Sequence, residues 1–150
     1  MRLNTLPLSR ECNCLALRAA ARRVTQFYDR HLAPTGLRTS QFSILAKLKR
    51  LGPLPINALA ADMVMDRTTL GRNIRPLQRD GLLRIKPAPF DRRAKELHLT
   101  KAGERRLRAA AEQWLAAQAR FETVFGVKRA ADLRALLRAA TAGEFAPADC

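Results

Sequence analysis

Apolar side chains recur at helical spacing along most of the chain. From about residue 10 to residue 32 they follow one another every three or four positions, at Cys14, Leu17, Ala21, Val24 and Tyr28. This spacing is typical of a helix that packs one seam against other helices. Pro34 and Gly36 should end the helix, because neither residue continues helical geometry easily.

Two shorter helices are expected next. The first should be capped by Thr39 or Ser40 and should end at the break formed by residues 51–53. Its apolar positions are Phe42, Leu45 and Leu48. The following helix should be capped by Asn57 and should run through Leu59, Ala60 and Met63.

A tight connection at Val64 and Met65 leads to residues 66–79, which carry two opposed faces. Leu70, Ile74 and Leu77 form an apolar stripe, and the polar stripe consists of Thr68, Arg72, Arg75 and Arg79. Asp66 should cap this helix by accepting from the amide of Thr68 or Thr69. Pro76 should bend it. Two short helices with so brief a connection, the second one basic, have the layout of a helix-turn-helix.

After Gly81 the pattern changes to the period of two that strands show. Leu83 and Ile85 alternate with basic residues, and Leu97 and Leu99 alternate with Glu96 and His98. These segments predict two antiparallel strands, with a basic turn at residues 88–95 between them.

Two further helices complete the chain. Thr100 should cap a long helix that ends at Gly126, and its seam is Leu107, Ala111, Trp114, Gln118, Phe121 and Phe125. A last helix runs through Leu133, Leu136, Leu137 and Ala140. With the first helix, these segments carry more apolar seam than one protomer can easily bury, so we expect a helical dimerisation region.

The charge of the chain points to a polyanionic partner. The 150 residues include 28 Lys and Arg against 13 Asp and Glu, a net charge of +15, while the 47% hydrophobic content is that of a folded domain. Residues 67–108 alone hold thirteen basic and four acidic side chains. A net +9 of the +15 therefore lies in this stretch, which runs from the basic helix through the hairpin to the start of the long helix.

The remaining composition narrows the location and chemistry. The chain has no apolar run long enough for a membrane span and no export signal at its start, so we expect a cytoplasmic protein. Its three cysteines do not suggest a disulfide framework. Cys12 and Cys14 should point in different directions if both are helical. Together with His31 and His98 they show no recognised ligand spacing, so neither a metal nor a cofactor is expected.

The order of these elements resembles the MarR family of bacterial transcription regulators. The resemblance covers about residues 10–140. Its motifs are Leu59-Ala60, residues 66–70 (DRTTL), residues 80–83 (DGLL), residues 91–93 (DRR), Leu99-Thr100 and Gly103. It implies a mainly α fold with a small β-wing: a winged helix-turn-helix at residues 38–100, flanked by dimerisation helices at 10–33 and 101–140, with a tail at 141–150. It also implies a homodimer on a pseudo-palindromic DNA operator, usually as a repressor.

The resemblance implies DNA contacts in two places. Base reading is expected from Arg67, Thr68, Thr69 and Arg72, while Arg75 and Arg79, further along, should meet phosphates or solvent. The wing arginines would be Arg92 and Arg93, with Asp91 orienting one of them. With Lys95 they place three positive side chains on the turn itself, which suits the minor groove because its negative potential attracts arginine. Gly71 has no side chain for a base, which indicates either close backbone approach to DNA or a tolerated helix glycine.

The resemblance leaves two kinds of signal open. Relatives bind small aromatic compounds between the winged helix and the dimer helices, where Tyr28, His31, Phe42 and Trp114 are expected, although each also suits core packing. Alternatively, Cys14 lies where peroxide-sensing members keep a reactive cysteine, with Arg10 and Arg18 one turn away to favour the thiolate. Only Tyr28 matches the tyrosines of that branch, so a cysteine buried as a small apolar residue is the competing interpretation.

Two other classes of function fit less well. A non-specific nucleic-acid-binding protein would explain the charge, but single-strand binders usually place aromatic platforms among basic residues, and here only Phe90 lies in the basic region. An enzyme is not expected, because the sequence has no phosphate-binding glycine loop, no paired carboxylates in an apolar setting, and no nucleophile placed with a histidine and an acid.

Overall fold

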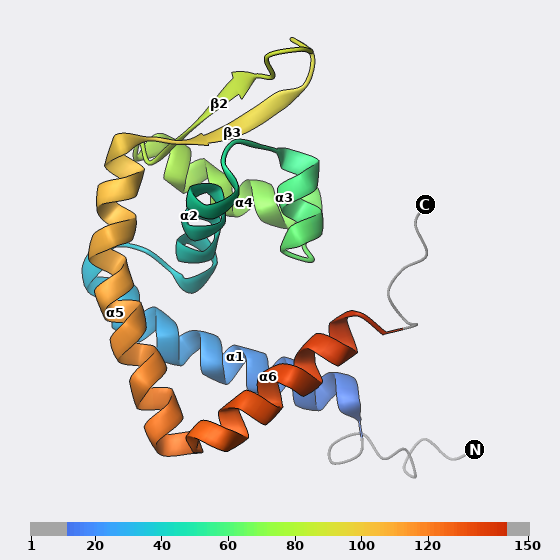
Figure 1. Ribbon diagram of the computed structural model, residues 1–150, viewed down its shortest axis with the longest axis vertical. Coiled ribbons are helices and arrows are strands. Elements are labelled where there is room, and N and C mark those ends of the chain that lie inside the picture. Colours follow the sequence, from blue (N-terminus) through green and yellow to red (C-terminus); the bar gives the residue numbers. More distant parts are fainter. Residues whose placement is uncertain (1–11, 144–150) are drawn as a thin grey trace. The chain divides into compact units, whose positions relative to one another are not determined.

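The computed structural model describes residues 12–143, which form two compact units, the first ending at Trp114 and the second beginning at Leu115. In chain order the elements are α1 (Asn13–Leu32), the 3₁₀ turn η2 (Ala33–Thr35), α2 (Thr39–Leu51), β1 (Leu54–Pro55), α3 (Ile56–Asp62), α4 (Arg67–Arg79), β2 (Leu83–Pro87), β3 (Lys95–Leu99), α5 (Lys101–Phe125) and α6 (Val127–Thr141) (Figure 1). The predicted fold class, mainly α with a small β-wing, is confirmed.

The wing is the outer part of a three-stranded antiparallel sheet with the order β1-β3-β2. Leu97 of β3 lies opposite Leu54 on one side and Ile85 on the other. The predicted hairpin is confirmed, and its apolar alternation places Leu83 and Leu97 in the core. Strand β1 was not expected from the sequence, because two residues are too few to show a period.

The core of the first unit lies between the helices and the sheet. The predicted apolar stripe of α4 is confirmed, since Leu70, Ile74 and Leu77 are all buried. They belong to one cluster with residues of α1, α2, α3 and the sheet, which includes Leu32, Ile44, Leu45, Leu48, Leu59, Leu83 and Leu97. Burial of a side chain of this size stabilises a fold by about 1.5–3 kcal/mol, so α4 is anchored by its inner face.

Two of the predicted helix caps are wrong. Helix α2 has Arg38 at its N-cap, and Thr39 is its first residue. The free amides there are bonded by side chains of other residues: Gln41 Oε1 accepts from Arg38 N at 3.0 Å, and Asp29 Oδ1 accepts from Thr39 N at 2.7 Å. Helix α3 begins at Ile56, directly after β1, so Asn57 lies inside it.

The connections before α4 and after it follow the prediction. Helix α3 ends at Asp62, and Val64 adopts a positive φ of 52° in the short connection that follows. A β-branched residue rarely has this conformation, so a tight turn imposes it. Helix α4 continues past Pro76 to Arg79, and Gly81, with φ 70°, then redirects the chain into β2.

The second unit is the end of α5 with α6. Gly126, with φ 99°, ends α5 as predicted. Ala117 and Ala130 are buried, and Arg134 of α6 forms an ion pair with Glu122 of α5 at 3.1 Å. Several large apolar side chains of this unit remain exposed, namely Leu115, Val124, Val127, Leu136 and Leu137. None of the helices between residues 12 and 143 is long and apolar enough to cross a membrane.

Candidate nucleic-acid interface

The start of α4 is fixed by Asp66, as the sequence predicts. Asp66 Oδ1 accepts from Thr69 N at 2.8 Å, and Asp66 Oδ2 accepts from the Thr69 hydroxyl at 2.6 Å. These bonds, the hydroxyl bond foremost, hold the pKa of the Asp66 carboxyl below its ordinary value. Because the Thr69 hydroxyl donates to Asp66, its proton is not available to a base while this cap is formed.

The outer face of α4 presents the predicted DNA-reading side chains together. Thr68, Arg72, Arg75 and Arg79 are exposed on the face opposite the buried leucines and isoleucine, and Arg67 is exposed at the first position of the helix. Thr69 is exposed as well, at the end of the helix that Asp66 caps. The guanidinium group donates in a planar fork that fits phosphate oxygens and the acceptor edge of guanine, so this face suits the major groove of DNA.

Sequence reasoning missed the contacts that position this helix. The side chain of Asn73 lies between the polar and apolar faces of α4, where it bonds to Ser40 of α2 and to the Thr69 carbonyl. Asp29 of α1 likewise holds the start of α2 through Thr39. Asn73 follows Thr69 by four positions, so the sequence could have predicted the bond within α4. It contains no pattern that pairs Asn73 with Ser40, or Asp29 with Thr39, because these partners lie on different helices.

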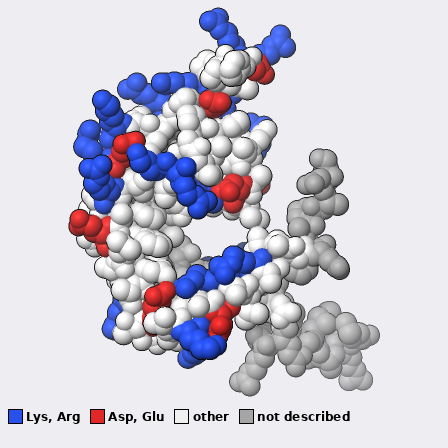
Figure 2. All heavy atoms as spheres, viewed as in Figure 1, with Lys and Arg blue, Asp and Glu red and all other residues white. Residues whose placement is uncertain are grey.

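The wing presents a second group of basic side chains. Arg92, Arg93 and Lys95 are exposed, and Figure 2 shows Lys and Arg side chains at the tip of the wing. Asp91 Oδ1 accepts from the backbone amide of Arg93 at 2.9 Å. In the structure, therefore, Asp91 contacts Arg93 through the backbone of the turn.

The four residues expected around a ligand lie in different surroundings. Phe42 is 9% exposed and its ring stacks on Trp114, with centroids 5.9 Å apart. The rings of Tyr28 and Phe27 pack edge to face, with their centroids 5.5 Å apart. Of the four, only His31 lines the open groove of about 480 Å³ in the first unit, whose lining is Phe27, Arg30, His31, Pro34 and Gln113.

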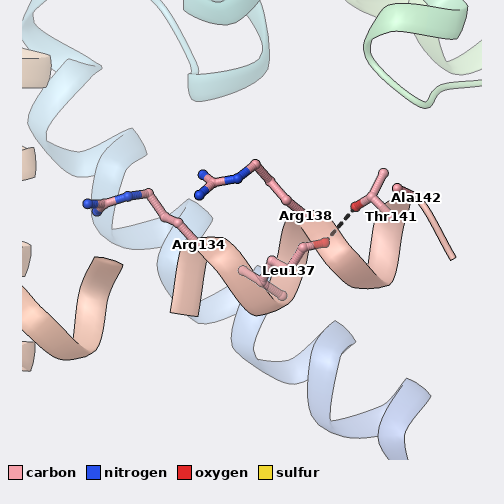
Figure 3. A pocket seen from close by; sticks show the side chains of 5 residues that line it. All are labelled: Arg134, Leu137, Arg138, Thr141 and Ala142. Atoms are coloured by element: carbon pink, nitrogen blue, oxygen red, sulfur yellow. Dashed lines mark hydrogen bonds between the residues drawn. The ribbon is translucent and has the colours of Figure 1, made fainter. Parts of the chain in front are cut away.

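A second hollow, of about 610 Å³, lies along α6 (Figure 3). Its lining residues are Arg134, Leu137, Arg138, Thr141 and Ala142, and the Thr141 hydroxyl donates to the Leu137 carbonyl at 2.9 Å. Four of these residues lie on α6 and Ala142 is its C-cap, so this hollow is an open helix face and cannot enclose a small ligand as a cavity would.

The two cysteines near the start of α1 differ in exposure: Cys12 is half-buried and Cys14 is exposed. Cys12 is the N-cap of α1 and its sulfur accepts from Leu15 N at 3.4 Å, so the premise that both cysteines are helical is wrong. Cys14 is exposed, and it is not a core residue of this protomer. Arg10 and Cys150 lie outside the described residues. Among residues 12–143 no three His, Cys, Asp or Glu side chains are grouped as metal ligands.

Comparisons with known proteins agree with this geometry. The MarR family model matches residues 37–95, which cover α2 through the start of β3. The transcriptional regulator MosR of M. tuberculosis is 37% identical, with 89% of this chain and 98% of that chain covered and a TM-score of 0.75. A structure of MosR in complex with DNA is 38% identical, with 88% and 98% covered and a TM-score of 0.75.

More distant structures share the same fold. The transcriptional repressor CouR, bound to a 23-mer DNA duplex, is 25% identical, with 87% of this chain and 93% of that chain covered and a TM-score of 0.79. A comparison with curated protein sequences finds no match. Given the extent of the MosR match and the family model across the winged helix-turn-helix, the chain belongs to the MarR family of DNA-binding transcriptional regulators.

Proposed function

We propose that the protein is a repressor that binds a specific double-stranded operator as a homodimer. The observation that carries this proposal is the amphipathic character of α4. Its inner face is buried in the core, and its outer face exposes Arg72 and Arg75, which could enter a groove of DNA. The wing adds Arg92 and Arg93 at a second place on the same unit. Phosphate contacts would set affinity and base contacts would set sequence preference.

The proposed dimer rests on the apolar surface of the helical parts. Leu136 and Leu137 of α6 are exposed, and Leu137 lines the hollow that Figure 3 shows. Burial of such a surface by a second copy follows the usual closed twofold arrangement, in which the same patch serves both protomers. A twofold dimer presents two α4 helices, which suits an operator of two related half-sites.

Quantitative gel shifts test the proposed DNA binding. The duplex upstream of the chain's own gene is compared with a scrambled duplex of equal length and with single-stranded RNA, and the mass of the free protein is measured by sedimentation. We expect a dimer that prefers one duplex by a factor of at least about 10³ over non-specific DNA. Equal affinity for all three probes would instead show a general nucleic-acid-binding protein, and a monomer would remove the basis for a two-half-site operator.

We further propose that a small aromatic acid releases the repressor from DNA by binding the groove beside His31. Phe27 and Pro34 offer apolar walls to a ring, while Arg30 offers an exposed guanidinium group to a carboxylate. The polar side chains of His31 and Gln113 complete the lining. Such a mixture of apolar walls and a few polar groups is typical of sites for small ligands.

The test is a panel of aromatic acids and their thioesters added to the protein–DNA complex. A true inducer should release wild-type protein from DNA. Arg30→Ala should raise the concentration of acid needed for half-release by at least about tenfold, which equals about 1.4 kcal/mol, while leaving DNA affinity without the acid unchanged. Arg22→Ala is the matched control, since Arg22 is an exposed arginine of the same helix that does not line the groove. An equal loss in both variants would show a general effect of charge and would reject the site.

A second candidate signal is oxidation of Cys14, which the exposure of that thiol favours. The Cys14 thiolate would attack an organic peroxide, break its O–O bond, become a sulfenic acid and release the alcohol. A second thiol would then displace water to form a disulfide. Peroxide should then release wild-type protein from DNA and spare Cys14→Ser, and mass spectrometry should locate the oxidised sulfur. Release of Cys14→Ser at the same peroxide concentration would exclude this mechanism.

A further inference from the structure

Phe90 stands at the tip of the wing with its side chain wholly in solvent. Its relative exposure is 102%, whereas the other aromatic side chains between residues 12 and 143 are buried or half-buried. A phenylalanine left in water forgoes about 1.5–3 kcal/mol that burial of the ring would contribute. Within residues 12–143 nothing covers this ring, so its apolar surface is open to a binding partner.

The turn that carries Phe90 is held by its own hydrogen bonds. Ala88 N donates to the Ala94 carbonyl at 2.8 Å across the base of the turn, and Ala94 N donates to the Asp91 carbonyl at 3.1 Å. Pro89 fixes its own φ immediately before Phe90. The ring is therefore presented on a short closed turn, which lowers the entropy lost when it enters a binding site.

The surroundings of the ring indicate one kind of occupant. Within three positions of Phe90 lie the exposed Arg92 and Arg93, with Asp91 as the single acid of the tip. The minor groove of DNA attracts arginine by its negative potential. Its walls are sugars, and many proteins insert a phenylalanine there between neighbouring base pairs. A narrow protruding turn with a bare ring and two guanidinium groups matches both features.

We propose that Phe90 is a minor-groove wedge, which inserts beside a base step where the wing meets the operator and partly unstacks it. This inference rests on the proposed binding of duplex DNA and adds a residue that reads DNA without hydrogen bonds. Pyrimidine–purine steps unstack most easily, so the wedge favours such a step at the position that the wing contacts. Each protomer of a dimer would contribute one wedge, and the two would bend the duplex.

The test uses a duplex selected from a randomised library by the wild-type chain. 2-Aminopurine, whose fluorescence rises when it unstacks, is placed at successive steps of that duplex. With wild-type protein we expect a rise confined to one step in each half-site. Phe90→Ala should abolish the rise and weaken affinity about tenfold, which equals about 1.4 kcal/mol, whereas Phe90→Trp should retain both.

Salt dependence separates the wedge from a charge effect. Phe90→Ala should leave the slope of log K against log salt unchanged, while Arg92→Ala should reduce its magnitude by about 0.9 if that arginine contacts a phosphate. Circular dichroism should show that Phe90→Ala folds as wild type, since the ring is fully exposed in the part of the chain that the structure describes.

Several results would overturn the proposal, and they differ from a failure of DNA binding itself. If Phe90→Ala binds the selected duplex with wild-type affinity and the 2-aminopurine signal persists, the wedge is rejected while operator binding stands. The wedge is likewise rejected if Phe90→Ala weakens binding of the chain to anionic phospholipid vesicles and leaves its affinity for the selected duplex unchanged. If the wild-type chain selects no duplex at all, the proposed function fails, and the wedge fails with it.

Discussion

The Ser40 hydroxyl of α2 donates a hydrogen bond of 2.6 Å to Asn73 Oδ1 of α4, and this bond joins the two helices. Asn73 Nδ2 in turn donates to the Thr69 carbonyl at 3.0 Å, in the first turn of α4. The buried stripe of Leu70, Ile74 and Leu77 turns one face of α4 toward the core. The Ser40–Asn73 bond adds a directional contact beside that face, and we expect it to help set the direction in which Arg72 points.

Ser40→Ala should therefore weaken both stability and DNA binding. Loss of a part-buried hydroxyl that is bonded to an amide typically costs about 0.5–1.5 kcal/mol of unfolding free energy, which urea denaturation measures. Ser43→Ala is the matched control, because the Ser43 hydroxyl donates only to the Thr39 carbonyl of its own helix. Equal DNA affinity of the two variants would show that the Ser40–Asn73 bond does not position α4.

The Asp66 cap should make the start of α4 sensitive to acid. The pKa of Asp66 is lowered by folding, chiefly through the Thr69 hydroxyl and then the Thr69 amide. A lowered pKa means that the carboxylate contributes stability above its unfolded value of 3.8, and that this contribution is lost as pH falls through the folded pKa. The relevant window therefore lies below about pH 4.

Urea midpoints of wild type, Asp66→Ala and Asp66→Asn measure this effect. At neutral pH the urea midpoint of wild type should be higher than that of Asp66→Ala. The difference between the two midpoints should shrink once the Asp66 carboxylate is protonated. Asp66→Asn is the control, since asparagine caps a helix without titrating in this range. A gap between wild type and Asp66→Ala that stays constant down to about pH 3 would mean that the carboxylate charge does not stabilise the cap.

The sequence was sufficient for elements whose pattern is local and repeated. Leu70, Ile74 and Leu77 predicted the buried face of α4, and the alternation around Leu83 and Leu97 predicted the hairpin. Both patterns arise because a single face of a regular element meets the core. The outer face of α4 followed from the same periodicity.

Features that depend on distant partners could not be predicted in this way. The contact between Ser40 and Asn73 joins residues 33 positions apart, and β1 forms only because Leu54 meets Leu97 across the sheet. The sequence also cannot tell whether an aromatic residue lines a ligand site or packs in the core. Phe42 was compatible with either place, and in the structure its ring stacks on Trp114. The groove residues Arg30 and Gln113 come from different helices, so no single motif contains them.

Arg72 and Arg75 should affect DNA binding in different ways. If Arg72 reads a base, Arg72→Ala costs about 1–3 kcal/mol on the preferred duplex and broadens the sequences selected from a random library. Arg75→Ala should weaken specific and non-specific duplexes alike and reduce the salt slope by about 0.9, as expected for a phosphate contact. Full sequence discrimination by Arg72→Ala would reassign base reading to other side chains of α4.

Gly103 should tolerate no side chain. A Cβ built at this position would lie 2.0 Å from the Leu82 carbonyl oxygen and 2.7 Å from a methyl carbon of Leu99. Backbone atoms cannot move aside without shifting the start of α5 from the sheet, so Gly103→Ala should destabilise the chain by about 1–3 kcal/mol or more. Urea denaturation measures this loss, and an unchanged midpoint would show that α5 can pack on the sheet at a greater distance.

At Gly71 we expect alanine to stabilise the chain. The variant also distinguishes a glycine that allows close approach to DNA from a glycine that the helix merely tolerates. It lies inside α4, and a Cβ there would meet nothing within 4 Å. Alanine loses less backbone entropy than glycine in a helix, so Gly71→Ala should stabilise the free protein by about 0.5–1 kcal/mol. If the glycine allows close approach of α4 to a base or sugar, the same variant should nonetheless bind the selected duplex more weakly. Higher stability with unchanged affinity would show instead that Gly71 is a helix glycine without a role in DNA contact.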